Sequence, residues 1–296
     1  MSTSNPNRAV YLALLAFFLL SLMDALIKHM GSHHSAVTVS FARFASAGVI
    51  SLGIWVAAGA PRMTIALIQI HSLRGALQAV SMVLFAMSLA NLKFLEAMSI
   101  AFLAPLLIPL LSAVILKEHL NLIPMVRAFL AFVGACLTAI GAASAPLSGA
   151  NPTLGAATAI AAAFTYALSI VLLKDRAQID GPILSGVFSS CIPALFIAPL
   201  LFVAGDPIGV VDLPAIVGLG VLSTAAMALL TLAYGMSDTQ RIAPLEYSAA
   251  VWAGLLGWFV FKEAPNSFAL AGCAIILATC LWSVIPDRSR TNKLNG

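Results

Sequence analysis

The sequence predicts an all-α membrane protein with ten transmembrane helices, arranged as two inverted repeats of five helices each. Its composition, the spacing of its charged residues and an internal repeat lead to this prediction. Of the 296 residues, 61% are hydrophobic and 9% are charged, whereas soluble globular proteins carry about 25% charged residues. Such a chain has too few polar side chains to cover a water-facing surface, and it is too hydrophobic to stay disordered in water.

Long segments without charge occur along the whole chain. A membrane-spanning helix needs about 20 mostly apolar residues. Four segments of that length contain no Asp, Glu, Lys or Arg: 97–116, 181–205, 213–237 and 264–286. Residues 128–173 form a longer uncharged stretch, which Ser, Pro, Gly and Asn residues interrupt between 144 and 152. Because this stretch is too long for one span, it predicts two helices joined by a short turn.

The remaining spans follow from shorter apolar runs. The first run follows Arg8 and leads into Asp24 and Lys28 without a small-x-small cleavage site. It therefore predicts a membrane span and not a secretory signal peptide. Further charge-free runs at 44–61, 75–92 and 247–261 complete the set. In chain order, the helices are predicted at 9–29, 36–58, 70–91, 95–116, 122–143, 153–173, 183–204, 213–236, 242–261 and 266–285.

The distribution of Lys and Arg predicts the orientation, because these residues accumulate on the cytoplasmic side of membrane proteins. With the N-terminus inside, Arg43 falls within the second helix and only Lys28, Lys93 and Lys262 fall on the outer side. The others fall on the inner side: Arg8, Arg62, Arg74, Lys117, Arg127, Lys174, Arg176, Arg241, Arg288, Arg290 and Lys293. Both termini are therefore predicted to be cytoplasmic. The net charge of +4 reflects topology, since no basic run suited to nucleic acid is present.

The chain repeats itself at a spacing of 145 residues. The segment Lys117-Glu118-His119-Leu120-Asn121 recurs as Lys262-Glu263-Ala264-Pro265-Asn266, each time between two apolar helices. The spacing predicts two five-helix units, residues 1–148 and 149–296. Because five is odd, the second unit must enter the membrane from the opposite side. Inverted repeats of this kind are a common construction of secondary transporters.

Four segments carry a resemblance to a known superfamily. They are Ser40-Phe41-Ala42-Arg43-Phe44, Phe102-Leu103-Ala104-Pro105-Leu106, Ala161-Ala162-Ala163-Phe164-Thr165-Tyr166-Ala167 and Arg241-Ile242-Ala243-Pro244-Leu245-Glu246-Tyr247. With the ten helices, they resemble the EamA-type members of the drug/metabolite transporter superfamily over essentially the whole chain. Two features depart from that pattern. Lys replaces the frequent Gly before the Glu of each Lys-Glu pair, and Ala250 stands where Pro105 has its counterpart.

The resemblance implies a secondary transporter that moves small organic solutes by alternating access. The nearest subgroup is the amino-acid exporters of bacterial inner membranes, so amino acids or related metabolites are the expected substrates. A flippase or carrier for lipid-linked sugars or nucleotide-type substrates is the alternative. The resemblance also implies a cavity between helices one, three, four, six, eight and nine. Besides the small-molecule substrate, membrane lipid is the expected partner, and the sequence leaves a monomer and a weak dimer open.

Charged residues within the spans are the first site candidates, since each costs at least about 2.5 kcal/mol near a helix centre. Asp24 either pairs with Lys28 one turn later or binds a substrate ammonium or a proton at the cavity mouth. Arg43 is interpreted as a structural cation paired with Asp24 or Glu96, with support of a substrate carboxylate as the alternative.

Polar, Met and aromatic residues on the helices implied to line the cavity complete the candidates. They are Gln78, Met82, Met98, Ser99, Phe102, Tyr166 and Tyr247. Met and aromatic walls accept varied side chains because they repack easily. Glu246 is expected to pair with Arg241 near the inner side. Glu118 and Glu263 are interpreted as structural charges that brace helix ends.

No cofactor, metal or enzymatic activity is predicted. The five His and four Cys show no CxxC pair and no acidic cluster beside them, so zinc binding and a disulfide framework are not indicated. The sequence contains no HExxH, GxSxG or paired catalytic Asp motif. It also lacks GxxxxGK[ST], which excludes direct ATP drive through a P-loop.

Overall fold

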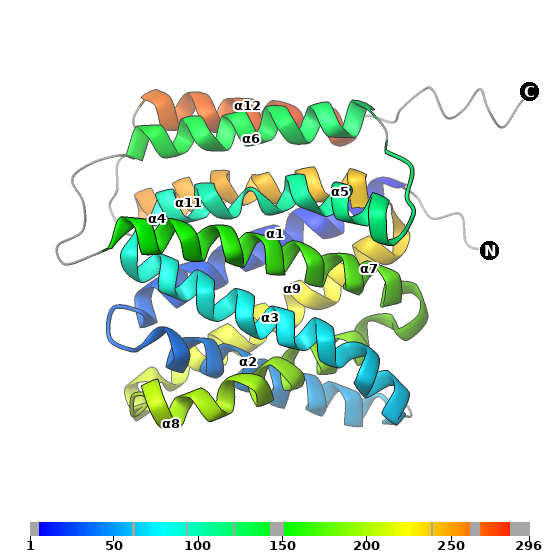
Figure 1. The fold of residues 1–296 in the computed structure, drawn as a ribbon, viewed down its shortest axis with the longest axis vertical. Helices are drawn as coiled ribbons and strands as arrows, with labels where there is room; N and C mark the ends of the chain where they lie inside the picture. Colours follow the sequence, from blue (N-terminus) through cyan, green and yellow to red (C-terminus); the bar gives the residue numbers. More distant parts are fainter. Residues whose placement is uncertain are drawn as a thin grey trace, which may run out of the picture.

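The computed structural model describes residues 6–60, 63–92, 94–120, 122–142, 151–237, 239–260 and 267–284. These residues form helices joined by turns, and no strand occurs among them (Figure 1). The α-helices are α1 (Pro6–Met30), α2 (Ala36–Ala57), α3 (Ile65–Asn91), α4 (Phe94–Ala101), α5 (Ala104–Ile115), α6 (Leu122–Ala142), α7 (Pro152–Ile197), α8 (Leu201–Ala204), α9 (Leu213–Met236), α10 (Thr239–Ile242), α11 (Ser248–Phe259) and α12 (Ser267–Val284). The 3₁₀ helices are η1 (Ala198–Leu200), η2 (Val210–Asp212) and η3 (Ala243–Tyr247).

Six stretches of the described chain are long and apolar enough to cross a membrane. They lie in α1, α2, α3, the two arms of α7 with α8, and α9. Shorter apolar helices are α5 and parts of α6 and α12. The predicted all-α membrane class is confirmed. The boundaries of the two predicted units, 1–148 and 149–296, stay a prediction.

The predicted sixth and seventh helices are the two arms of one kinked element, α7. The kink lies at Gly181, whose φ of 69° and ψ of 177° are non-helical. A positive φ of this size is favourable mainly for glycine, which has no Cβ atom to clash. Asn151 caps the start of α7 by accepting a hydrogen bond from the Leu154 backbone N–H at 3.1 Å, ahead of Pro152 at the first helical position, where no donor is needed.

The fourth and ninth helices are each interrupted, which differs from the continuous helices predicted at 95–116 and 242–261. The fourth breaks at Phe102 and Leu103 between α4 and α5, because Pro105 lacks an N–H and its ring disfavours a straight helix before it. The ninth consists of α10, η3 and α11, with Pro244 near the start of η3. Irregular backbone at membrane depth is tolerated where it lines a cavity or is buried in protein.

Helices from the two halves of the chain pack against each other throughout the molecule. In Figure 1, α6 and α12 lie together at one end of the longest axis, and α2 and α8 lie at the other. Between them, α1 packs on α9, and α3 packs on α7. Thus the first helix of each half contacts the third helix of the other half. A two-fold symmetry axis that relates the halves requires such reciprocal contacts.

Two residues that the repeat makes equivalent contact each other. Phe102 and Tyr247 are 145 positions apart, and the Tyr247 hydroxyl donates a hydrogen bond to the Phe102 carbonyl oxygen at 3.0 Å. Their ring centroids are 5.5 Å apart. Equivalent residues can touch only close to the axis that relates them. The contact therefore supports the predicted repeat and puts both helix interruptions near its axis.

A buried polar cluster joins α3 to the kink of α7. Asp180 accepts hydrogen bonds from Arg176 Nε and Nη2 at 2.9 Å each, and its Oδ2 lies 2.9 Å from Nε2 of His71. Arg74, which is 1% exposed, donates from Nε to Nδ1 of His71 at 3.3 Å and from Nη2 to the Ser185 carbonyl at 3.3 Å. Since Nδ1 of His71 accepts a hydrogen bond, its Nε2 carries the hydrogen and donates a hydrogen bond to the Asp180 carboxylate. The cluster fixes the turn between the two arms of α7.

Replacing Gly220 with alanine should lower stability. A Cβ atom at Gly220 of α9 would lie 2.9 Å from both the carbonyl carbon and Cβ of Ser46 in α2. The Ser46 backbone cannot move aside without shifting its helix, so we expect a loss of about 1–3 kcal/mol in the free energy of unfolding. Chemical denaturation of the purified protein in detergent measures the loss.

Gly53→Ala is the matched control, because a Cβ atom at Gly53 meets nothing within 4 Å. Alanine there should be neutral or stabilise the protein by up to about 1 kcal/mol, since it restricts the unfolded chain. Equal losses in the two variants would show that the close approach of α9 to α2 does not cause the effect.

The repeat places a second closely packed glycine at Gly75 of α3, 145 positions before Gly220. A Cβ atom at Gly75 would lie 2.4 Å from Cγ2 of Ile192.

Candidate functional site

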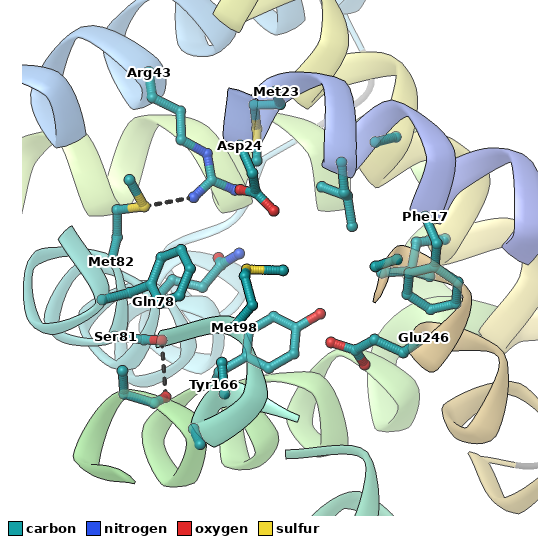
Figure 2. A pocket seen from close by; sticks show the side chains of 18 of the residues that line it. Phe17, Met23, Asp24, Arg43, Gln78, Ser81, Met82, Met98, Tyr166 and Glu246 are labelled. Carbon is teal, nitrogen blue, oxygen red and sulfur yellow. Dashed lines mark hydrogen bonds between the residues drawn. The ribbon is translucent and has the colours of Figure 1, made fainter. Parts of the chain in front are cut away.

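A cavity lies where the interrupted helices meet the long ones (Figure 2). Its walls come from α1, α2, α3, α4, α7, α9, η3 and α11. The cavity has a volume of about 140 Å³, enough for on the order of ten waters or a small organic solute. Its apolar lining is rich in Met and Phe: Phe17, Leu20, Met23, Phe44, Met82, Phe85, Met98, Phe102, Met227 and Leu230.

Arg43 of α2 extends its guanidinium into this cavity. Its Nη1 donates to the thioether sulfur of Met82 at 2.8 Å, and its Cζ lies 4.8 Å from the ring centroid of Phe44. Its Nε is buried without a hydrogen-bond partner among the described residues. A thioether is a weak acceptor, so neither Nη1 nor Nε of Arg43 is bonded to a strong acceptor among the described residues. The guanidinium is thus suited to bind a carboxylate that enters the cavity.

Asp24 of α1 supplies a carboxylate to the same end of the cavity. Figure 2 shows its side chain next to that of Arg43, and the two groups interact electrostatically. The helical spacing that brings Asp24 here also puts Phe17, Leu20 and Met23 of α1 on the cavity wall. One cation and one anion therefore face the same space, which is the pattern that a zwitterion requires.

Glu246 of η3 supplies a second carboxylate on the opposite wall. Figure 2 shows Tyr166 of α7 pointing its hydroxyl towards this group, and the two side chains interact. Oε2 of Glu246 is buried and has no hydrogen-bond partner among the described residues. Glu246 lies in the 3₁₀ helix η3, two positions after Pro244, and its side chain lines the cavity.

Gln78 and Ser81 bring polar groups of α3 to the cavity. Ser81 donates to the Ala162 carbonyl of α7 at 3.0 Å, which joins α3 to the arm that carries Tyr166. Gln78 is 6% exposed, and its Oε1 has no hydrogen-bond partner among the described residues. An unpaired amide oxygen in an apolar site is costly. Gln78 is therefore a further group that a polar substrate would satisfy.

Most of the site residues proposed from the sequence come together in this cavity. Asp24, Gln78, Met82, Met98, Phe102 and Tyr166 all line it. Tyr247 does not, because it is fully buried and bonded to the Phe102 carbonyl. The side chain of Ser99 and all of Glu263 lie outside the described residues. Glu118 follows α5, and its backbone N–H donates to the Ser112 carbonyl at 3.5 Å.

Two charged residues interpreted as structural also line the cavity. Arg43 lies beside Asp24, one of the two partners expected for it, and Glu246 faces Tyr166, while its expected pairing with Arg241 stays a prediction. The signal for Glu246 was present in the sequence. An acidic residue two positions after a proline, between apolar runs, indicates interrupted helix at membrane depth. Among the described residues, no three His, Cys, Asp or Glu side chains form a group suited to a metal.

The sequence profile of the EamA-like transporter family matches the chain twice, at residues 7–140 and 153–285. Two characterised proteins are similar over almost their whole length. An S-adenosylmethionine uptake transporter from Rickettsia bellii is 24% identical, with 94% of this chain and 96% of the relative covered. The pseudopaline exporter CntI from Pseudomonas aeruginosa is 22% identical, with 96% of each chain covered. A crystal structure with 22% sequence identity has the same fold, with a TM-score of 0.73 over 94% of this chain and 96% of the other.

Proposed function

Because this chain belongs to the EamA-like transporter family, we propose that it is a secondary transporter for amino acids or closely related metabolites. It binds a substrate in the cavity described above and exposes it to either side in turn. The expected direction is export across a bacterial inner membrane. The observation that carries the proposal is the pair formed by Arg43 and Asp24, one cation and one anion that line the same cavity.

The charged pair fits the two charges of an amino acid. The substrate carboxylate takes donors of Arg43, whose Nη1 is otherwise bonded to the weakly accepting sulfur of Met82. The substrate ammonium takes the carboxylate of Asp24. Both interactions are charge-assisted and lie in a cavity with a largely apolar lining, where they are stronger than at the surface. The substrate thus replaces the weak contacts of the empty cavity with strong ones.

The apolar wall accepts the rest of the substrate. Met82, Met98 and Phe102 are nearly fully buried and line the cavity from α3, α4 and the α4–α5 break, respectively. Unbranched thioether side chains change conformation at low cost, which permits side chains of different shape. The relative from Rickettsia bellii takes up S-adenosylmethionine, a compound with an α-amino acid group, and this agrees with the proposed head-group recognition.

Transport by purified protein in liposomes tests the proposal. Liposomes loaded with L-methionine should accumulate labelled L-methionine by exchange, whereas protein-free liposomes should not. L-Methionine methyl ester lacks the carboxylate, and 3-(methylthio)propionic acid lacks the ammonium. Neither should compete at concentrations at which unlabelled L-methionine competes fully. Equal competition by all three compounds would contradict recognition by Arg43 and Asp24, and exchange of lipid-linked sugars alone would favour the flippase.

The proposed orientation has both termini in the cytoplasm, on the basis of the Lys and Arg asymmetry along the chain. A reporter that is active only in the cytoplasm should work when fused after Gly296, and one that is active only outside should be silent. Because the five-helix spacing ties the second unit to the first, the opposite result would overturn both the orientation and the inversion.

A further inference from the structure

The cavity has one carboxyl group more than the binding of a zwitterionic amino acid requires. The Arg, Lys, Asp and Glu side chains among its lining residues are Arg43, Asp24 and Glu246. Arg43 and Asp24 balance each other, and they also match the two charges of a zwitterionic substrate. Glu246 is left over in both the empty and the loaded cavity. The amino-acid head group therefore leaves one carboxylate without a counter-charge.

Among the described residues, none that faces Glu246 supplies a positive charge to its unbonded oxygen. Facing it are Tyr166 from α7, Asp24 from α1 and Tyr234 from α9, with Tyr247 beside it on η3. Of the other elements that pack on η3, α5 and α11 have no titratable side chain. Three further elements that pack on η3 carry titratable side chains: Arg241 on α10, Arg127 and Cys136 on α6, and Cys273 on α12. None of these lines the cavity, and Arg127 lies over the ring of Trp282.

An uncompensated carboxylate at this depth is unfavourable, because an unpaired charge in a low-dielectric site neutralises instead of staying ionised. We propose that Glu246 always holds one positive charge: a proton when the cavity is empty, and a cationic group of the substrate when it is loaded. The preferred substrates are then amino acids with an additional positive charge, and the transporter exchanges them for protons. This inference rests on the proposed function, because Arg43 and Asp24 must bind the amino-acid head group.

The exchange follows from charge balance in the cavity. When a cationic substrate enters, its extra charge lies near Glu246, the carboxyl O–H bond breaks, and the proton leaves to the water on that side. When the substrate departs on the other side, the carboxylate takes up a proton from there. The Tyr166 hydroxyl donates to the carboxylate in the loaded state and accepts from the carboxylic acid in the empty state. A proton gradient directed inward would thus drive the cation outward.

Two probes that differ by one methyl group and one charge test the inference in the wild-type protein. S-Methyl-L-methionine is a sulfonium, and L-methionine is its neutral thioether counterpart. Binding of the sulfonium should release one proton, so its apparent Kd should fall by up to about tenfold for each unit of rising pH while Glu246 is protonated. The Kd for L-methionine should stay constant. The same pH dependence for both probes would overturn the inference.

Glu246→Gln removes the charge and keeps the shape of the side chain. The variant should lose proton release and should bind the sulfonium at least tenfold less tightly relative to L-methionine. Asp175→Asn is the matched control, since Asp175 is exposed on α7 and should leave both values unchanged. A variant that keeps proton release and the preference for the sulfonium would overturn the assignment to Glu246.

An infrared measurement of the protein without substrate separates this inference from the proposed function. At neutral pH, the wild type should show the C=O band of a protonated carboxylic acid, and Glu246→Gln should lack it. If the band behaves in this way but neither probe binds, the proton site stands and the amino-acid substrate is wrong. If the band is absent from the wild type or persists in the variant, the inference fails.

Discussion

Arg43→Gln should reduce the affinity for L-methionine about 100-fold while the protein remains folded. The guanidinium gives a substrate carboxylate two parallel charge-assisted hydrogen bonds, which together contribute roughly 3 kcal/mol. In the empty cavity its Nη1 contacts the thioether of Met82 at 2.8 Å, its Cζ lies over the ring of Phe44, and its charge interacts with that of Asp24. Glutamine fits the space and removes the charge. Equilibrium binding of labelled L-methionine to the purified protein gives the value.

The comparison of two ligands shows whether the loss comes from the carboxylate. L-Methionine methyl ester has no carboxylate, so its weak binding should be similar in the wild type and in Arg43→Gln. Arg43→Lys keeps the charge but not the planar fork, and it should give an intermediate affinity. If Arg43→Gln weakened the binding of both ligands by the same factor, Arg43 would act by holding the helices and not by contacting the substrate.

Asp180→Asn should destabilise the protein by about 3–5 kcal/mol, the usual cost of leaving a buried charge without its partner. The Asp180 side chain is 4% exposed and that of His71 is 1% exposed. Asparagine cannot balance Arg74, which is buried beside His71 and interacts electrostatically with Asp180. It also loses the paired hydrogen bonds from Arg176. Chemical denaturation in detergent measures the change.

Two further variants give this prediction its controls. Asp175→Asn removes an exposed carboxylate from the same helix and should change stability by less than about 0.5 kcal/mol. The double variant Asp180→Asn with Arg74→Leu removes both buried charges, so it should recover part of the loss. Additive losses in the double variant would show that Arg74 and Asp180 contribute independently. The cluster would then not act as one unit.

The fold class and the extent of most helices could be read from the sequence because they depend on local composition. A span requires about 20 apolar residues, and the charge gaps of this chain show where such runs occur. The repeat of Lys117-Glu118 at Lys262-Glu263 led to the inverted construction, and the segment around Arg43 led to the family. Candidates such as Asp24 and Gln78 stood out because polar groups in a membrane are costly.

The helix interruptions were missed because their signals are weaker than the apolar pattern around them. Pro105 and Pro244 each lie inside a run that is hydrophobic enough to predict an unbroken span. Whether a proline kinks a helix or ends it depends on what satisfies the freed backbone groups. Here, the contact between Tyr247 and the Phe102 carbonyl supplies one such partner, from a segment 145 residues away.

The sequence by itself determined that this chain crosses a membrane, repeats itself and belongs with small-molecule carriers. Only the tertiary structure decided which charges meet. It brought Arg43, Asp24 and Glu246 from three separate elements to one cavity, and it joined Asp180 to His71 and Arg74 elsewhere. Local patterns specify a helix and its apolar face, because those depend on neighbours a few residues apart. The partner of a buried charge depends on how whole helices pack, and no short segment of the sequence contains that information.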